Sequence, residues 1–382
     1  CMEPSACKSA TAMAHGDIPM MNEHLEDKVF VLLGATSALG PAKSLLELGA
    51  TVAAIARPNS SKLTELQSYA RTQTCGTLLL PSLHDDENDD AASSPVIVGA
   101  NLMEHAPHLA QWITSPEVCP TANTQIILCS LAYLDGEANV RACVAMDLIA
   151  EYVCLHHPNN TALSFLISPG TVHAVPEEAA MDAKRRYEES TPFWHKALTT
   201  MTTSQLQPSY TWLSDENTND DDTTRQDGTT EDAVRVLNGL SLVQGPNYAL
   251  SKTVQMWRSM VAASQGHVVS CPLAPPSRTD SMVSHATVSA ALDGMPYLEP
   301  LVIFAQEPCR TLMTVLMLHD IFQSKHNKKH DHPLQLFFHN SVHGGMWRSP
   351  YLMESVSAIS FIFGKVGFQP SGWSPDAAMA PM

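Results

Sequence analysis

The stretch Lys28-Val-Phe-Val-Leu-Leu-Gly-Ala-Thr-Ser-Ala-Leu-Gly40 decides the fold of this chain. Residues 29–33 form an unbroken apolar run, as expected for a strand that is buried on both faces of a parallel sheet. Gly34 and Gly40 bound a predicted turn, and residues 41–49 begin with Pro and end with Gly, which predicts a helix. Residues 51–56 are a second apolar run. Strand, turn, helix and strand together make a βαβ unit.

The same alternation continues along the chain. Further strands are predicted at residues 96–98, 125–129, 163–167, 267–270 and 334–338, and further helices at residues 61–69, 105–113, 138–154, 248–263 and 300–322. Strands that alternate with helices in this way favour an α/β fold. We therefore predict a Rossmann-type, doubly wound, mainly parallel sheet of seven strands with helices on both faces.

Three segments fall outside this alternation. Residues 1–26 have no clear periodicity and are expected to form an extended N-terminal arm, ahead of a Rossmann domain at residues 27–345. An acidic insertion at about residues 171–246 interrupts that domain; its polar core is too poor in apolar residues to order itself, and only its flanks are expected to dock. Residues 346–382 form an apolar, aromatic C-terminal extension that is expected to close the cleft or to contact a partner.

Composition excludes several classes of protein. The 382 residues are 44% hydrophobic and 16% charged, so the chain can bury a full core. Lys and Arg number 22 against 39 Asp and Glu, and the net charge of −17 argues against nucleic acid or an anionic membrane as the main partner. No run of about 18 apolar residues predicts a membrane span. The nine scattered cysteines indicate an intracellular, reducing compartment, either the cytoplasm or the interior of an organelle such as a plastid or mitochondrion.

The turn between the first strand and the first helix predicts a dinucleotide site. Small residues let the backbone approach a pyrophosphate, and the helix that follows presents N–H groups to it. Arg57 follows the second strand, where an acidic residue would bind a free ribose 2′-hydroxyl. An arginine with Ser60 and Lys62 nearby suits a 2′-phosphate instead, which favours NADP(H) over NAD(H).

A second motif, Tyr248-Ala-Leu-Ser-Lys252, opens the helix predicted at residues 248–263. Residues four apart share one helix face, so the phenol and the ammonium point into the same region. A nearby Lys lowers the pKa of a Tyr, which suits acid–base chemistry at neutral pH, so we expect Lys252 to lower the pKa of Tyr248.

These two motifs together resemble the short-chain dehydrogenase/reductase family, over roughly residues 27–345. The family's turn is Thr-Gly-x-x-x-Gly-x-Gly, and here Leu33 replaces the Thr while Ala38 stands at the middle Gly. The resemblance implies catalytic roles for Ser168, Tyr248, Lys252 and Asn139, with Tyr248 as the acid/base. It further implies that the cofactor is bound by Gly34, Thr36, Ser37, Leu39, Gly40, Arg57, Asn101, Leu102, Ser130, Lys252, Pro272 and Thr279.

Several positions depart from the family pattern around the substrate site. The usual Asn-Asn-Ala-Gly is Cys129-Ser-Leu-Ala132, and Ser168 and Tyr248 lie 80 residues apart where about a dozen is usual. Two functions therefore stay open. The first is an NADP(H)-dependent oxidoreductase that acts on a small carbonyl or alcohol substrate. The second is a non-catalytic structural or assembly subunit of a larger protein complex that keeps the fold and bound nucleotide.

No metal site is predicted. His326, His330 and His332 have helical metal-ligand spacing, but they stand in a hydrophilic segment without a nearby cysteine and are interpreted as a hydrated loop. The Asp run at residues 220–222 lacks the alternation of a calcium loop. Members of the family often pair through the helices on either side of the active site, so a homo-oligomer is expected.

Overall fold

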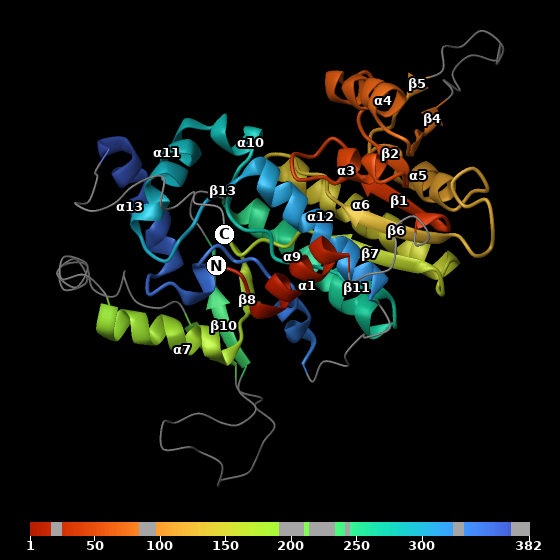
Figure 1. The fold of residues 1–382 in the computed structure, drawn as a ribbon. Coiled ribbons are helices and arrows are strands. Elements are labelled where there is room, and N and C mark those ends of the chain that lie inside the picture. Colours follow the sequence, from red (N-terminus) through yellow and green to blue (C-terminus); the bar gives the residue numbers. More distant parts are fainter. Residues whose placement is uncertain are drawn as a thin grey trace.

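A computed structural model describes residues 1–16, 25–83, 97–190, 210–213, 234–240, 245–323 and 332–367. Its centre is a six-stranded parallel sheet with the order β11-β7-β6-β1-β2-β3 (Figure 1). The strands are β1 (Lys28–Leu33), β2 (Thr51–Ile55), β3 (Thr77–Leu79), β6 (Gln125–Ser130), β7 (Thr161–Phe165) and β11 (Val268–Ser270). This is the doubly wound strand order of a Rossmann fold, so the predicted fold class is confirmed, although the sheet has six strands instead of the predicted seven.

Alternate residues of the strands face two separate layers of helices, because successive side chains of a strand point to opposite sides of the sheet. Val29, Val31 and Leu33 pack against one layer, while Phe30 and Leu32 pack against the other. The first layer contains α5 (Ala106–Ile113), α6 (Glu137–His156) and α9 (Gly245–Ser264). The second contains α3 (Ala42–Glu47), α4 (Ser61–Gln73) and α12 (Gln306–Phe322).

The strand prediction was wrong in three places. The third strand of the sheet is β3, which was not predicted because it is only three residues long. Residues 97–98 form β5, which pairs antiparallel with β4 (Ser82–Leu83) outside the main sheet. Residues 334–338 lie in a 3₁₀ helix (Pro333–Phe338), because Pro333 suits a helix start and the His332 Nδ1 accepts from the Leu334 N–H.

The N-terminal residues do not form the extended arm that was expected. Pro4–His15 is a helix, α1, which lies beside α12 (Figure 1). Ala6 is fully buried in this contact, and the Ser9 hydroxyl donates to the Asn340 side-chain oxygen at 2.8 Å. Helix α1 is therefore part of the folded body, held by contacts with residues about 300 positions away.

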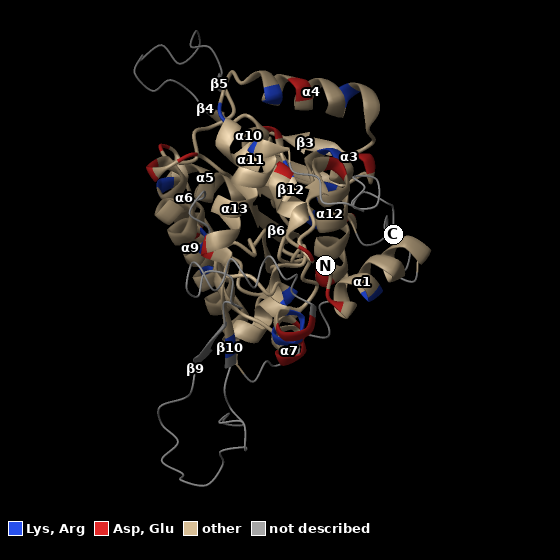
Figure 2. Cartoon of the chain, turned by 90° about the vertical axis from the view of Figure 1, so that its left-hand side faces the viewer, with Lys and Arg blue, Asp and Glu red and all other residues tan. Residues whose placement is uncertain are grey.

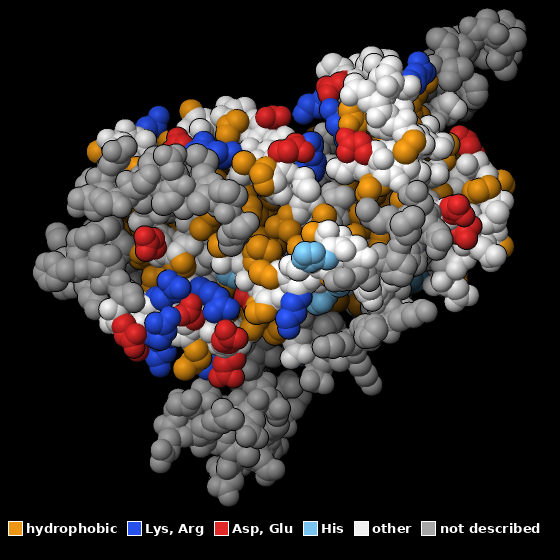
Figure 3. Space-filling model, viewed as in Figure 1, with side chains coloured by type: hydrophobic (Ala, Val, Ile, Leu, Met, Phe, Trp, Pro, Cys, Tyr) orange, Lys and Arg blue, Asp and Glu red, His pale blue; other side chains and the backbone are white. Residues whose placement is uncertain are grey.

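The flanks of the insertion are ordered against the body, as expected. Strands β8 (Val172–Ala174), β10 (Val234–Asn238) and β9 (Tyr210–Leu213) form an antiparallel sheet, and α7 (Glu177–Arg185) follows β8. Charged side chains of both signs gather over α7, where Asp182 pairs with Arg185, Arg186 and Arg348 (Figure 3). The Asp-rich core at residues 215–232, like the acidic loop at residues 84–90, lies outside the described residues.

The C-terminal extension contributes a helix, α13 (Met353–Val366), that crosses α11 (Ala286–Gly294) closely. A Cβ atom on Gly294 would lie 1.8 Å from the Ser360 carbonyl oxygen, so only glycine permits this approach. Both helices are nearly free of charged residues, in contrast to α4 and α7 (Figure 2). Within the described ranges no helix is long and apolar enough to span a bilayer, and all nine cysteines are free thiols.

Candidate active site

Four residues expected to be catalytic meet where β6 and β7 end. Ser168 follows β7 by three residues, and Asn139 lies in the first turn of α6, just after β6. Tyr248 and Lys252 lie in the first two turns of α9, which packs against α6. A bidentate ion pair joins the two helices, with Arg258 Nε and Nη2 at 2.6 and 3.1 Å from the Asp147 carboxylate oxygens. This is the carboxyl edge of the sheet, where doubly wound folds bind their ligands.

The phenol of Tyr248 lies in a poorly hydrated site beside Ser168. Burial raises the pKa of Tyr248 to about 12, and a hydrogen bond with the Ser168 side chain opposes that rise. The Ser168 hydroxyl oxygen also accepts from the Gly170 N–H at 3.1 Å, which fixes its orientation. Tyr248 is therefore held as a neutral phenol, the form that can donate a proton.

Lys252 is turned toward the end of β7. Its Nζ donates to the Leu166 carbonyl oxygen at 2.8 Å and to the Gln255 side-chain oxygen at 3.0 Å, and lies 5.8 Å from the centre of the Tyr248 ring. Burial lowers the pKa of Lys252 to about 8. The expectation that Lys252 lowers the pKa of Tyr248 was wrong, because loss of hydration dominates at the phenol and the ammonium is occupied by other acceptors.

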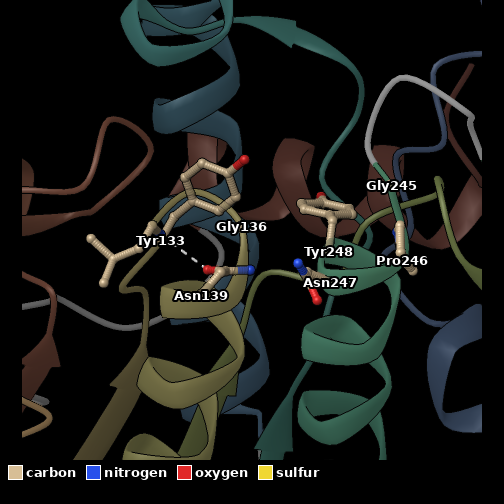
Figure 4. Close-up of a pocket in the computed structure, with 8 residues that line it drawn as sticks. Tyr133, Gly136, Asn139, Gly245, Pro246, Asn247 and Tyr248 are labelled. Atoms are coloured by element: carbon tan, nitrogen blue, oxygen red, sulfur yellow. Dashed lines mark hydrogen bonds between the residues drawn. The ribbon is translucent and has the colours of Figure 1, made fainter.

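A small cavity of about 80 Å³ separates the start of α6 from the start of α9. Figure 4 shows Tyr133 and Asn139 on one side and Asn247 and Tyr248 on the other. The Asn139 side-chain oxygen accepts from the Leu134 N–H at 3.0 Å, so its amide group is fixed at the cavity wall. The rings of Tyr133 and Tyr248 meet edge to face, with centres 6.0 Å apart.

The insertion leaves and rejoins the body directly beside Ser168. β8 and β10 pair antiparallel, and the Gly239 N–H donates to the Thr171 carbonyl oxygen at 2.9 Å. A Cβ on Gly239 would lie 2.1 Å from the Pro169 carbonyl oxygen. The two ends of the insertion are thus joined at one point, which lets Ser168 and Tyr248 meet although they are distant in sequence.

We expect Gly239→Ala to destabilise the protein by more than about 2 kcal/mol, because the added methyl group collides with rigid backbone. The same clash displaces Ser168, so turnover should also fall. Gly266→Ala is the matched control: Gly266 has φ +91° but open space around it, so it should cost only about 1 kcal/mol. Thermal unfolding measures both, and equal losses would contradict this role for Gly239.

The predicted dinucleotide turn lies against the segment that follows β6. Gly34 has φ +96°, and a Cβ there would lie 2.5 Å from Ala132 Cα, so this position requires glycine. The turn closes through the Ser37 N–H, which donates to the Gly34 carbonyl oxygen at 2.9 Å, and the Gly40 N–H, which donates to the Ser37 carbonyl oxygen at 3.0 Å. Thr36, Ser37 and Leu39 are half-buried on this turn, next to the ends of β1 and β6.

Arg57 and Asn101 lie close together at the end of β2. Arg57 is exposed, and the Ala100 N–H donates to the Ala56 carbonyl oxygen at 3.0 Å. The Asn101 side-chain oxygen accepts from the Met103 N–H at 3.1 Å, while Leu102 is buried. Ser60 caps α4 by accepting from the Leu63 N–H, so its hydroxyl already has a partner.

The other expected cofactor residues are buried along the same edge. Ser130 ends β6, and Pro272 follows β11 with its carbonyl oxygen accepting from the Ile167 N–H at 3.2 Å. Pro272 is therefore adjacent to Ser168. Thr279 precedes α10 (Asp280–Val283), and its hydroxyl lies 3.2 Å from that of Ser281.

Sequence reasoning missed Tyr133, Gln255 and Gly239. Gln255 follows Lys252 by three positions and Tyr248 by seven, so helical spacing alone places it on the same face. Tyr133 comes three residues after β6, where an aromatic residue at a strand end indicates a site wall. Nothing in the sequence indicates that Gly239 meets Pro169.

No protein-family model matches the chain, and no curated protein matches it in sequence. Several solved structures are similar to it. An L-sorbose reductase from Gluconobacter frateurii, complexed with NADPH and L-sorbose, is 13% identical with a TM-score of 0.44 and covers 84% of this chain and 97% of its own. A short-chain type dehydrogenase/reductase from Mycobacterium ulcerans is 12% identical (TM-score 0.43; 94% and 98% covered). The angucycline C-6 ketoreductase LanV, with bound NADP, is 11% identical (TM-score 0.40; 78% and 91% covered).

These likenesses extend over most of each chain, at 11–13% sequence identity. The order of the central strands is that of a doubly wound sheet, and Ser168, Tyr248, Lys252 and Asn139 gather at its carboxyl edge. Short-chain dehydrogenase/reductase structures are therefore among those that this chain resembles, as its motifs predicted.

Proposed function

We propose that this protein is an NADP(H)-dependent oxidoreductase that interconverts a small carbonyl compound and its alcohol. The observation that carries the proposal is the convergence of Ser168, Tyr248 and Lys252 at the carboxyl edge of the sheet, although Ser168 and Tyr248 lie 80 residues apart in the sequence. A scaffold has no physical need for a half-buried lysine and a half-buried phenol side by side, since removing each from water is unfavourable. No contact of the described residues favours the alternative of a non-catalytic subunit.

The residues around the turn fit a phosphorylated dinucleotide. The turn carries only small residues apart from Leu39, so its backbone can approach a pyrophosphate. Arg57 is exposed at the end of β2, and no carboxylate of the described residues lies within ion-pair distance of it. Arg57 would therefore bind a 2′-phosphate, with Asn101 and Leu102 beside the adenine, while Ser130, Pro272 and Thr279 would border the nicotinamide.

The chain's own groups supply the proton chemistry. NADPH, when bound, provides the hydride that adds to the carbonyl carbon. Tyr248 donates its phenolic proton to the carbonyl oxygen, which becomes the alcohol hydroxyl, and the phenol is then reprotonated from solvent. Ser168 holds the carbonyl oxygen by a hydrogen bond. Lys252 would hold the nicotinamide ribose of the cofactor beside Tyr248. Asn139 fixes the start of α6 at the cavity wall.

The direct test is a fluorescence titration with NADPH and with NADH, followed by a screen of small ketones and aldehydes for NADPH oxidation. We expect micromolar binding of NADPH, weaker binding of NADH, and turnover of at least one carbonyl compound. Absence of binding at millimolar concentration of either nucleotide would reject the oxidoreductase. Nucleotide binding without turnover of any carbonyl compound would favour the non-catalytic subunit.

Arg57→Glu should weaken NADPH binding by at least about tenfold and leave NADH binding within a few-fold, because a bidentate phosphate contact becomes a repulsion. Arg71→Glu on the exposed side of α4 makes the same charge change away from the site and is the control. Equal losses in both variants would show a general charge effect instead of phosphate recognition. The same titrations provide the measurement.

We also propose that two copies pair through α6 and α9. Val144 and Leu148 on α6 and Leu250 and Trp257 on α9 are exposed, and Trp257 is 67% accessible. Large apolar side chains gathered on two adjacent helices are typical of a protein–protein contact. Trp257→Glu should therefore shift the protein toward monomer in sedimentation velocity, whereas Ile362→Glu on α13, which also replaces an exposed apolar residue, should not. A wild-type monomer at all concentrations would contradict the pairing.

A further inference from the structure

Two histidines and an aspartate converge at the end of α12, and the proposed reaction uses none of them. His319 and Asp320 lie in the last turn of α12, and His339 follows the 3₁₀ helix Pro333–Phe338. One ligand atom from each lies within 4.8 Å of the others. The His339 Nε2 is 3.3 Å and the His319 Nδ1 3.8 Å from the same oxygen, Asp320 Oδ1.

The protein's own hydrogen bonds do not satisfy this cluster. Of the two histidines, only His339 comes within hydrogen-bond distance of Asp320. The His319 Nδ1 is shielded from solvent and has no hydrogen-bond partner among the described residues. A buried polar atom without a partner is unfavourable, and native proteins rarely keep one without a reason. A cation between the three side chains would bond both imidazoles and the carboxylate together.

From this geometry we propose that His319, Asp320 and His339 bind a divalent transition-metal ion of the Zn²⁺ class. Two imidazole nitrogens and one carboxylate oxygen select such an ion over Mg²⁺ or Ca²⁺, which prefer oxygen ligands alone. With metal–ligand bonds of about 2.0–2.2 Å, ligand atoms of a tetrahedral site lie about 3.4 Å apart, so a small rotation of the half-exposed His339 ring closes the site. Water would fill the remaining position.

The surroundings of Asp320 support a metal ligand. Its Oδ2 accepts from the Ser270 hydroxyl and its Oδ1 from the Asn340 side-chain N–H, each at 2.6 Å. Such outer contacts orient the ligands of metal sites. His319 and Asp320 also stand at the carboxyl end of a long helix, where the partial negative charge of the last turn favours a cation.

The same contacts explain what the ion would hold together. Asn340 has φ +55°, and its backbone N–H donates to the Ser5 hydroxyl on α1 at 3.0 Å. Ser270 ends the edge strand β11. The metal would therefore tie α12, β11 and the segment after residue 338 into one unit on which α1 docks. This role is independent of nucleotide binding, so the two proposals succeed or fail separately.

The test uses the full chain after removal of metals with a chelator. Titration with Co²⁺ should give the visible absorption of a tetrahedral site and saturate at one equivalent, and Zn²⁺ should displace it and raise the melting temperature. His339→Ala should weaken Zn²⁺ binding by at least about 100-fold, and because His339 is exposed this variant should fold. His319→Ala should have the same effect.

The double variant His326→Ala/His330→Ala is the matched control, since these histidines lie outside the described residues in the segment between α12 and His332. It should bind one Zn²⁺ as the wild type does. Absence of saturable binding by the wild type would overturn the proposal. So would binding that survives both single variants but is lost in the double variant, because the hydrophilic segment would then be the ligand.

Discussion

Tyr248→Phe should lower turnover of a carbonyl substrate by about 10³-fold while NADPH binding stays within a few-fold of the wild type. The phenol donates the proton in the proposed reaction, and a positioned general acid contributes about 10²–10⁴-fold. The pKa of about 12 leaves the phenol neutral at physiological pH, so removing the hydroxyl removes the donor itself and not a charge. Steady-state rates and fluorescence titration on the same two proteins measure both quantities.

Tyr133→Phe is a close control, since Tyr133 lies on the same cavity and meets the Tyr248 ring edge to face. It makes the same chemical change on a ring whose centre is 6.0 Å away and should alter turnover only a few-fold. Equal losses of turnover in the two variants would show that turnover depends on the shape or hydration of the cavity and that Tyr248 is not the general acid. Unchanged turnover in Tyr248→Phe would reject the proposed mechanism directly.

Lys252→Met should abolish most turnover and also change how stability depends on pH. Burial lowers the pKa of Lys252 from 10.5 to about 8, so between these values the unfolded chain holds a proton that the folded protein lacks. Stability from this group therefore rises as the pH increases from about 8 toward 10.5, by up to about 3 kcal/mol in total. The methionine side chain has no proton to exchange, so the variant should lack this rise.

The difference between the two proteins isolates Lys252, because other groups titrate in the same window. Burial raises the pKa of the Cys129 and Cys154 thiols from 9.0 to about 12 and about 11. Above pH 9 the unfolded chain loses these protons while the folded protein keeps them, so their contribution to stability falls with rising pH in wild type and variant alike. Urea unfolding at pH 7.5 and pH 9.5 provides the measurement. Lys365→Met, an exposed lysine on α13, is the control and should follow the wild-type curve. Parallel curves for wild type and Lys252→Met would mean that Lys252 is well hydrated.

Local patterns were sufficient to predict the βαβ unit and the helix that carries Tyr248 and Lys252. A continuous apolar run between glycines specifies a buried strand, and spacing by four specifies a shared helix face. Both depend only on residues near one another in the chain. The same logic failed at residues 77–79, because three residues contain no period. It also failed at residues 334–338, because a five-residue segment with four apolar side chains fits a strand or a buried helical turn equally well.

Contacts between distant residues decided everything else. The meeting of Ser168 with Tyr248 depends on Gly239 closing the insertion against Pro169, and the docking of α1 depends on Asn340. The pKa of Tyr248 is raised where the motif predicted a decrease, since hydration of a side chain is a property of the folded surroundings. The sequence by itself determined the strand–turn–helix order and the residue types at the candidate site. Only the tertiary structure decided which of them meet, how well they are hydrated, and that His319, Asp320 and His339 converge.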